Sequence, residues 1–488
     1  LLLRVEDYLH RYPVCWRCDT ELVFRLVDEW FISMDELRHL IAEVTRRIRW
    51  IPAFGLEREL DWLRNMDDWM ISKKRYYGLA LPIWKCECGH VDVIGSETEL
   101  EQRAVDGWDE FAGNSPHRPW VDAVRIECPD CGQQVSRIPD VGNPWLDAGI
   151  VPFATLGYRH DRGEGSQWAQ WFPADWISES FPGQFRNWFY SMLAMSAVLE
   201  ETESFRACFT YALLRDEQGD EMHKSKGNAI WFEDAADKMG VDVMRWMYAS
   251  HTPANNLNFG YHIGDNVRRR FLIPLWNVYS FFITYANLDR WDPATAVEPE
   301  EKSELDRWLL SELNLLNRRV TDALGRWRPE EASRELQQFV DSLSNWYVRR
   351  SRRRFWTAEG ETPDAAAYWT LYTCLTTLSR LLAPFTPFVT EVMYQNLVAG
   401  KVEGAPDSVH LDDWPAVDET AIDEALSADV EVVRRMVSLG RSARSAAQLR
   451  VRQPLGSAVL IPRTDGERDS LQRLAGQIAE ELNVKAVE

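Results

Sequence analysis

The 488-residue sequence has no apolar run that approaches the roughly 20 residues of a membrane-spanning helix. It also lacks a charged segment followed by an apolar one near its first residue, the pattern of a secretory leader. Both absences favour a soluble, cytoplasmic protein that does not enter a membrane. With 45% hydrophobic residues and 23 tryptophans, the chain can form real cores, which excludes global disorder. Its length predicts roughly three or four domains.

Basic residues are also scarce. The chain has 55 Lys and Arg against 76 Asp and Glu, a formal net charge of −21. This charge excludes indiscriminate nucleic-acid binding but not recognition of one RNA through local patches. Four short basic stretches interrupt the acidic background, at residues 73–75, 268–270, 349–354 and 441–452. Any one of them is typical of a solvated helix face, but together they favour a polyanionic partner.

Cysteine is rare, yet six of the eight cysteines lie in close pairs. The other two, Cys208 and Cys374, stand alone in apolar surroundings and are expected to be buried. In a large acidic chain, close pairs favour zinc over disulfide bonds. The pairs are Cys15 and Cys18, Cys86 and Cys88, and Cys128 and Cys131.

Two of these pairs are predicted to form one structural zinc site. Tetrahedral Zn²⁺ takes four thiolate or imidazole ligands, usually from two short turns. Segments 85–90 and 127–132 have this form, and Gly89 and Gly132 allow the tight backbone. The predicted ligands are Cys86, Cys88, Cys128 and Cys131. Because one residue, rather than two, separates the first pair, His90 is an alternative ligand.

The remaining pair, Cys15 and Cys18, has no second pair to join. We expect it to be half of a second zinc site whose other ligands precede residue 1. The sequence begins Leu-Leu-Leu-Arg without a Met and ends at Glu488 without a closing element. These features predict a piece of a longer polypeptide.

The pattern of apolar residues changes near residue 270. Before it, short strands and helices alternate, which predicts a parallel α/β sheet with ligands at the carboxyl ends of its strands. After it, apolar residues recur at helical spacing over 305–324, 332–346 and 369–382, which predicts a helical bundle. A strand is predicted again at 457–462.

The segment 216–228 reads Asp-Glu-Gln-Gly-Asp-Glu-Met-His-Lys-Ser-Lys-Gly-Asn. It follows the apolar run 209–214, so we expect a strand that leads into a basic loop. Two lysines beside Ser and Gly suit a loop that closes on a polyphosphate and neutralises its charge. The alternative is an exposed hairpin loop without function.

This loop resembles the KMSKS signature of class I aminoacyl-tRNA synthetases. Further segments are similar, in the same order, to isoleucyl-tRNA synthetases. They are Asn-Trp-Tyr-Val-Arg-Arg-Ser-Arg-Arg-Arg-Phe-Trp at 345–356, Pro-Phe-Thr-Pro-Phe at 384–388, Ser-Val-His-Leu-Asp-Asp-Trp-Pro at 408–415 and Val-Arg-Gln-Pro-Leu at 451–455.

The resemblance implies the second half of a Rossmann-like catalytic domain with a zinc-binding insertion, followed by an α-helical anticodon-binding bundle. Residues 1–60 would hold the end of an editing insertion and the return to the catalytic core. Residues 61–270 would complete the catalytic domain, with the zinc insertion at about 85–138. The anticodon-binding domain would span 271–425, and 426–488 would open a C-terminal region.

The implied reaction is ATP-dependent ligation of isoleucine to tRNA(Ile) through an aminoacyl-adenylate, with Mg²⁺ accompanying ATP, by a monomer. Lys224 and Ser225 match the catalytic, ATP-binding signature. Gln184 matches a residue that binds the adenylate and the amino acid, and Trp188 a wall of the side-chain pocket, although a helix core also explains Trp188. Trp145 and Asp147 match a segment beside the active site. The implied tRNA-binding residues are Arg349, Arg350, Arg352 and Arg353.

Several residues depart from the family pattern. The signature carries Glu221 in place of a lysine and His223 in place of a serine, and Gly183 stands where an adenosine-contacting Asp is usual. Near pyrophosphate, Glu221 is unfavourable unless it turns away or pairs with Arg215. The HIGH signature is missing, since Tyr-His-Ile-Gly at 261–264 follows the loop instead of preceding it. The chain alone is therefore expected to be inactive. A tRNA-binding paralogue without amino-acid activation and a valine-specific relative remain alternatives.

Overall fold

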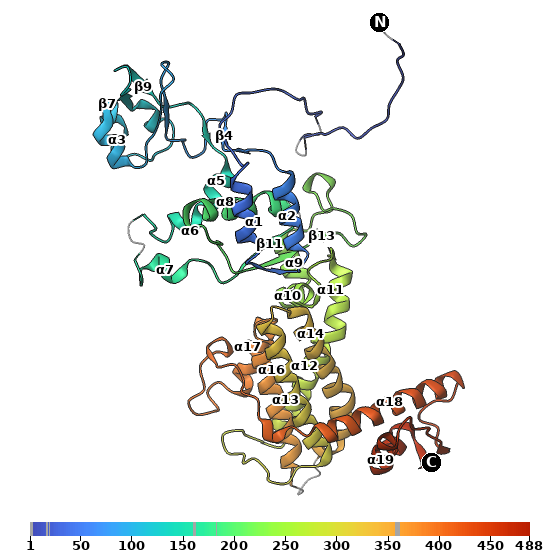
Figure 1. Ribbon diagram of the computed structural model, residues 1–488. Helices are drawn as coiled ribbons and strands as arrows, with labels where there is room; N and C mark the ends of the chain where they lie inside the picture. Colours follow the sequence, from blue (N-terminus) through green and yellow to red (C-terminus); the bar gives the residue numbers. More distant parts are fainter. Residues whose placement is uncertain (1–2, 16–17, 19, 160–162, 182, 357–361) are drawn as a thin grey trace. The chain divides into compact units, whose positions relative to one another are not determined.

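The computed structural model describes residues 3–15, 18, 20–159, 163–181, 183–356 and 362–488. The chain divides into two compact units, Leu1–Tyr211 and Ala212–Glu488 (Figure 1). The first combines a parallel sheet with helices, and the second is mainly helical. The predicted fold class is therefore confirmed, whereas the predicted domain boundaries stay predictions. None of the helices in the described ranges has the length and apolar character needed to cross a lipid bilayer.

The first unit contains a three-stranded parallel sheet. Its strands are β2 (Arg49–Ile51), β11 (Ile177–Ser180) and β12 (Ala207–Tyr211), in the order β11-β12-β2. In the register, Ile177 is opposite Cys208 and Ala207 is opposite Arg49. Parallel strands need crossover connections that place helices on the sheet faces, and this unit supplies them.

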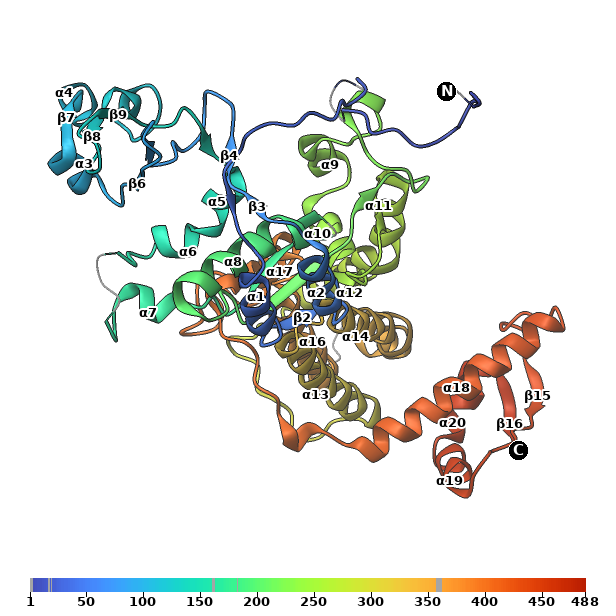
Figure 2. The same ribbon diagram turned by 45° about the horizontal axis from the view of Figure 1, so that its top comes forward.

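Several helices of the first unit pack around a core that is rich in aromatic side chains. The indole of Trp50 on β2 contacts the rings of Phe185, Phe189 and Phe205 at centroid distances of 5.9–6.3 Å. Helix α8 is apolar on all sides and largely buried, and α2 packs beside β2 (Figure 2). The helices are α1 (Leu37–Thr45), α2 (Gly55–Asn65), α5 (Pro144–Gly149), α6 (Val151–Ala154), α7 (Gln167–Trp171) and α8 (Trp188–Glu200). Short antiparallel pairs join β1 (Phe31–Ile32) to β3 (Trp69–Met70) and β4 (Ser72–Lys73) to β10 (Val141–Gly142).

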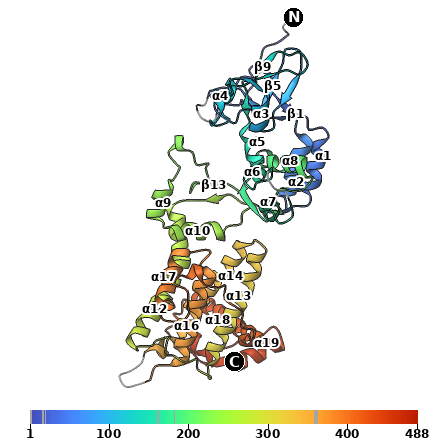
Figure 3. The same cartoon turned by 90° about the vertical axis from the view of Figure 1, so that its left-hand side faces the viewer.

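Residues 83–136 form a small module with its own core, built from two antiparallel sheets (Figure 3). Trp84, Phe111, Val124 and Ile126 are buried together there. Its elements are β5 (Ile83–Lys85), β6 (Val91–Val93), α3 (Glu97–Arg103), β7 (Ala104–Asp106), α4 (Trp108–Phe111), β8 (Arg125–Glu127) and β9 (Gln134–Ser136). Each hairpin, β5–β6 and β8–β9, ends in a turn that carries one cysteine pair.

The second unit opens with a short parallel strand pair. The apolar run 209–214, expected to be one strand, is instead divided between β12 in the first unit and β13 (Leu214–Arg215) in the second. The interruption at 212–213 has a visible cause, since both amides bond elsewhere: Ala212 N–H donates to the Pro253 carbonyl and Leu213 N–H to Asn256. Strand β13 pairs with β14 (Leu257–Asn258), and between them lie α9 (Phe232–Lys238) and α10 (Val241–Ser250).

The helical bundle confirms the helices predicted from the spacing of apolar residues. The three predicted apolar stripes lie in α13, in α14 and the π-helical turn after it, and in α16, all packed in one core (Figure 1). Helix α13 begins with a capping box in which Ser303 and Asp306 satisfy each other's backbone amides. The elements are α11 (Tyr261–Val267), α12 (Ile273–Leu288), α13 (Glu304–Gly325), α14 (Pro329–Ser342), α15 (Arg349–Ser351), α16 (Ala365–Leu382) and α17 (Pro387–Leu397), with π-helical turns at Arg268–Leu272 and Leu343–Val348.

A small α/β module ends the chain. Its elements are α18 (Glu424–Ala446), β15 (Leu455–Ala458), α19 (Asp465–Arg473), α20 (Ala475–Leu482) and β16 (Val484–Val487). Strand β15 pairs in parallel with β16 (Figure 2). It spans Leu455–Ala458, so it begins two residues before the predicted strand 457–462 and ends four residues before the predicted end, although the Leu460 amide still donates to the Glu488 carbonyl at 2.8 Å.

Candidate active site and metal centre

The four cysteines of the two hairpin turns lie together in the first unit. Their sulfur atoms are all within 4.8 Å of one another, with 3.5 Å between the Sγ atoms of Cys86 and Cys131 and 3.6 Å between those of Cys88 and Cys128. A tetrahedral Zn²⁺ with Zn–S bonds of about 2.3 Å places its ligand sulfurs about 3.8 Å apart. Both the donor type and the spacing therefore fit a four-thiolate zinc site.

Backbone hydrogen bonds close each turn around its cysteines. The Cys86 amide donates to the His90 carbonyl at 2.8 Å, and the Cys128 amide donates to the Gln133 carbonyl at 2.8 Å. Gly89 and Gly132 have φ of +100° and +72°, values that favour glycine. Burial raises the pKa of the Cys128 thiol, but amide hydrogen bonds at Asp130 and Cys131 outweigh this effect and lower it to about 7. Hydrogen bonds from backbone amides also act on the other three thiols, Cys86, Cys88 and Cys131, but burial and the neighbouring sulfurs outweigh them, so the pKa values of these thiols are raised.

His90 lies outside the sulfur cluster. Its Nδ1 is 3.0 Å from Asp130 Oδ2, and its Nε2 is 3.2 Å from Asp92 Oδ2. The imidazole is thus held between two carboxylates, which leaves the four sulfurs as the metal-binding group.

Among the described residues, no third metal-binding side chain joins Cys15 and Cys18. Within the described ranges, the cluster of Cys86, Cys88, Cys128 and Cys131 is the one group of three or more side chains that could hold a metal ion. Residues 16, 17 and 19 lie outside the described residues. The half-site stays a prediction.

In the second unit, Lys224 and Ser225 lie on the 3₁₀ turn Lys224–Lys226, and Lys224 is exposed. The amide side chain of Asn228 closes the loop: it accepts a hydrogen bond from the His223 amide at 2.9 Å and donates to Asp216 Oδ2 at 2.8 Å. The hydrogen bond from Asn228 is the largest of the effects that lower the pKa of Asp216.

The carboxylate of Glu221 lies close to two basic side chains. Its Oε1 lies 3.7 Å from Arg215 Nη2, and its Oε2 lies 3.5 Å from His223 Nε2. From the sequence, a glutamate at 221 near pyrophosphate was expected to be unfavourable unless it turned away or paired with Arg215. The structure contains the pairing with Arg215.

Gln184 and Trp188 belong to the first unit, at the junction of the 3₁₀ turn Gly183–Arg186 with α8. Gln184 Oε1 accepts a hydrogen bond from the Trp188 amide at 3.2 Å. Trp188 is half-buried and packs against the core. Both residues thus have a structural role at the start of α8, which leaves their contact with a ligand as a prediction.

Two acidic residues of the first unit have perturbed surroundings. Asp147 on α5 has one carboxylate oxygen buried and unbonded within the described part of the chain, and burial raises its pKa. Glu179 was not singled out from the sequence. It lies at the carboxyl end of β11, where parallel sheets bind ligands, and after burial it is the second cause that raises the pKa of Tyr211. The available signal was weak, since Glu179 is the charged residue of a short strand that reads Ile-Ser-Glu-Ser.

The arginines at 349–354 divide into three groups. Arg349 and Arg350 pair with Glu481 of α20, which is buried, and Arg350 also pairs with Glu480 at 3.0 Å. The side chains of Arg352 and Arg353 are exposed and have no ion pair with the described residues. These two are the arginines of the run that present an unpaired charge to solvent.

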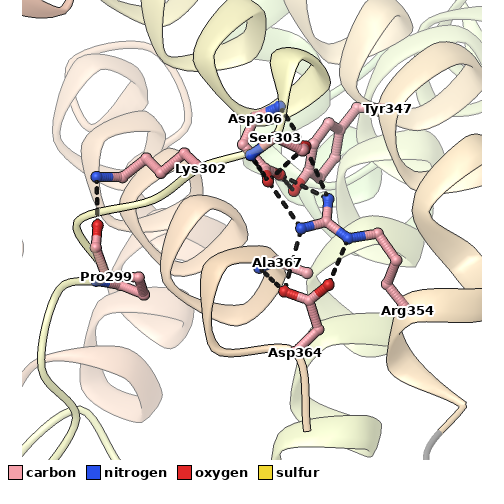
Figure 4. A network of polar contacts seen from close by, with 8 residues as sticks. All are labelled: Pro299, Lys302, Ser303, Asp306, Tyr347, Arg354, Asp364 and Ala367. Atoms are coloured by element: carbon pink, nitrogen blue, oxygen red, sulfur yellow. Dashed lines mark hydrogen bonds and ion pairs between the residues drawn. The ribbon is translucent and has the colours of Figure 1, made fainter.

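Arg354 is the centre of a polar network inside the bundle (Figure 4). Its guanidinium donates two hydrogen bonds to Asp306, at 2.7 and 2.8 Å, and two to Asp364, at 2.8 and 3.1 Å. The Tyr347 hydroxyl donates to Asp306 at 2.6 Å. Burial alone raises the pKa of Asp306, but the hydrogen bonds from Arg354, Ser303 and Tyr347 lower it overall. This arginine supports the fold.

Solved structures with a similar fold are synthetases. The Agrobacterium radiobacter K84 agnB2 LeuRS in its ternary complex with tRNA and LeuAMS has a TM-score of 0.53 and 21% identity, over 73% of this chain and 43% of that one. Mycobacterium tuberculosis methionyl-tRNA synthetase in complex with methionyl-adenylate has a TM-score of 0.56 and 15% identity, over 82% and 72%. At these identities the likeness shows the fold alone.

Curated relatives are more similar in sequence. Isoleucine–tRNA ligase of Dehalococcoides mccartyi is 42% identical over 495 residues, covering 100% of this chain and 48% of that protein. The Thermus thermophilus isoleucine–tRNA ligase is also 42% identical, over 491 residues, covering 100% and 46%. The chain thus spans about half the length of the curated relatives it matches.

Two family models match the two parts of the chain. The model of the anticodon-binding domain of tRNA ligases matches residues 306–460, and that of the class I tRNA synthetases (I, L, M and V) matches residues 17–260, half of the sequence. The chain belongs to the class I tRNA synthetases of the I, L, M and V group.

Proposed function

We propose that this chain is part of an isoleucine–tRNA ligase, which joins isoleucine to tRNA(Ile) at the expense of ATP. The observation that carries the proposal is the 42% identity to isoleucine–tRNA ligases along the whole chain. In the first step the isoleucine carboxylate attacks the α-phosphorus of ATP, and pyrophosphate leaves. In the second, a hydroxyl at the 3′ end of the tRNA attacks the carbonyl carbon, and AMP leaves.

Lys224 is assigned to the charge that develops on the leaving pyrophosphate. Its exposed ammonium is not paired with any described carboxylate, and Ser225 and the loop amides are assigned to the phosphates. Such a reaction depends on positioning and electrostatic stabilisation, because the phosphates and Mg²⁺ carry most of the charge. Gln184 is assigned to the polar part of the adenylate, and Trp188 to the wall of the isoleucine pocket.

Zinc is assigned to Cys86, Cys88, Cys128 and Cys131, whose sulfurs have the required spacing. When bound, the ion has a structural role, because all four ligand positions are taken by protein and none is left for a substrate. Cys15 and Cys18 are assigned to a second zinc site.

For tRNA, the assigned surface is that of the helical region, with Arg352 and Arg353 as the phosphate contacts. Arg349 and Arg350 are assigned only an indirect part, since both are paired with carboxylates of α20. We further propose a cytoplasmic monomer.

A second candidate function is tRNA binding without amino-acid activation, which Glu221 in the signature loop favours. Valine as the substrate is a third. The deciding experiment is isoleucine-dependent ATP–pyrophosphate exchange by the full-length gene product, with valine as the control. Exchange with isoleucine supports the ligase, and exchange with valine alone supports the valine-specific relative. Absence of exchange with either, from folded and zinc-loaded protein, rejects amino-acid activation in favour of the paralogue.

A further inference from the structure

Around the signature loop, several charged side chains are paired with one another, and Lys224 is not among them. Glu221 lies between Arg215 and His223, and Asp216 accepts a hydrogen bond from Asn228. Lys224 has no carboxylate within ion-pair distance among the described residues of the chain. Its ammonium lies instead over the indole ring of Trp231, with 4.2 Å between Nζ and the ring centroid.

Trp231 is well placed to act as a fixed surface. It directly precedes α9, and its carbonyl accepts the first helical hydrogen bond, from the Ala235 amide at 3.0 Å. Ala235 and Met239 lie in a buried apolar cluster that anchors this helix. Ile230, the residue before Trp231 in the sequence, packs against the same cluster. Trp231 as a whole residue stays 55% exposed, so no core packing accounts for a large aromatic residue here.

The contact has a specific electrostatic consequence. The face of an indole attracts a cation but carries no net charge, so it does not neutralise the ammonium as a carboxylate does. It touches one side of the ammonium and leaves the hydrogen atoms of the other side free to donate. It also restricts a side chain that otherwise loses much rotational freedom on binding. A lysine held in this way is oriented in advance and keeps its full charge for a phosphate.

We propose that Trp231 is a positioning residue, which holds Lys224 in the orientation that meets the developing charge of pyrophosphate. The inference rests on the proposed function, because it presupposes that Lys224 acts on ATP. It adds a residue outside the Lys-Ser-Lys-Gly sequence, on the helix that follows the loop, to the determinants of the reaction.

The test is ATP–pyrophosphate exchange by the full-length gene product with three variants. Trp231→Leu removes the aromatic face, Trp231→Phe keeps a weaker one, and Phe232→Leu is the matched control. Phe232 is the next residue, is 64% exposed, and has no cation over its ring among the described residues. A cation–π contact at an exposed site predicts that Trp231→Leu lowers kcat/KM for ATP about two- to fivefold. Trp231→Phe should lower it less, Phe232→Leu should not change it, and the KM for isoleucine should stay constant in all three.

A double-mutant cycle separates positioning of Lys224 from a general effect on the loop. In a Lys224→Gln background, Trp231→Leu should have no further effect, since the cation is gone. An equal loss in both backgrounds overturns the inference, as does an unchanged or increased kcat/KM in the Trp231→Leu variant. If Lys224→Gln lowers exchange while the Trp231 variants do not, the inference alone fails. If Lys224→Gln itself leaves exchange unchanged, the proposed role of Lys224 fails too.

Discussion

At the scale of single residues, identical side chains in one short run have different roles. Arg350, Arg353 and Arg354 lie within five positions of one another, yet the first pairs with α20, the second faces solvent and the third joins two carboxylates inside the bundle. The difference comes from partners distant in sequence, since Asp306 lies 48 positions before Arg354 and Glu480 lies 130 positions after Arg350. Charge content alone does not separate these roles.

Removing the guanidinium of Arg354 should strongly destabilise the bundle. Asp306 is fully buried, so the Arg354→Met variant leaves an uncompensated carboxylate in the interior. Breaking a buried pair in this way costs about 3–5 kcal/mol. Chemical denaturation should show this loss for Arg354→Met, while the exposed control Arg353→Met should change the free energy of unfolding by about 0.5 kcal/mol or less. Equal stabilities of the two variants would contradict the assigned role of Arg354.

The same network predicts how stability depends on pH. Burial would raise the pKa of Asp364, but hydrogen bonds from Arg354 and from the Ala367 amide lower it overall. A carboxylate whose folded-state pKa is lowered stabilises the fold above its unfolded pKa of about 3.9, and this contribution disappears as the pH falls through the folded pKa. Asp364→Asn should therefore destabilise the protein at pH 7, by about 1–2 kcal/mol because the side chain is partly exposed. The difference from the unsubstituted protein should shrink in urea denaturation over the interval from about pH 5 down through the lowered pKa of Asp364. A difference that stays constant over this interval would exclude ionised Asp364 as its source.

At the scale of elements, the helical bundle was the easiest part to predict and the signature-loop region the hardest. The apolar stripes at 305–324, 332–346 and 369–382 mark α13, α14 with its π-helical turn, and α16, because each helix buries one continuous face. The run 209–214 has the composition of one strand, but its amides at 212 and 213 bond to distant partners and divide it. Local patterns give local structure, and they miss what depends on contacts across the fold.

The candidate site shows the same contrast. Gly89 and Gly132, next to paired cysteines, are visible in the sequence and close the two turns that bring four sulfurs together. The contact between Lys224 and Trp231 was not predicted, although both residues lie in one segment. Their meeting depends on the 3₁₀ turn at 224–226 and on where α9 begins. The sequence pattern does not specify either of these.

The module that carries the four cysteines should depend on its metal. Its hairpins are short and its core is small, so a metal bound by the four thiolates would supply much of its stability. Cys128→Ser should lose about one zinc ion per chain relative to the unsubstituted protein, and the amides of β8 and β9 should exchange faster with solvent. His90→Gln is the matched control and should retain the metal, because His90 contacts two carboxylates rather than the cluster. Loss of zinc from His90→Gln would reinstate the histidine as a ligand. Metal analysis and hydrogen exchange provide the two measurements.

For the whole molecule, the net charge of −21 opposes any approach of RNA, so binding has to rest on a few local cations. Within the run 349–354, Arg352 and Arg353 are the arginines whose charges the described fold leaves unpaired. Each phosphate contact contributes about 0.7–0.9 to the slope of log affinity against log salt concentration. Replacing both with alanine should therefore weaken tRNA binding and flatten this slope by about 1.4–1.8.

The matched control for this prediction keeps the charge and changes its shape. Arg352→Lys with Arg353→Lys should retain most of the salt slope, because a lysine still displaces a counterion from a phosphate. It should lose some affinity, because an ammonium does not match the two-pronged geometry of a guanidinium. Filter binding or fluorescence anisotropy over a range of salt concentrations measures both quantities. If the alanine pair leaves affinity and slope unchanged, the tRNA-binding surface lies elsewhere on the molecule. If the double lysine variant flattens the slope as much as the double alanine variant, the phosphate contacts of Arg352 and Arg353 depend on the geometry of the guanidinium and not on its charge alone.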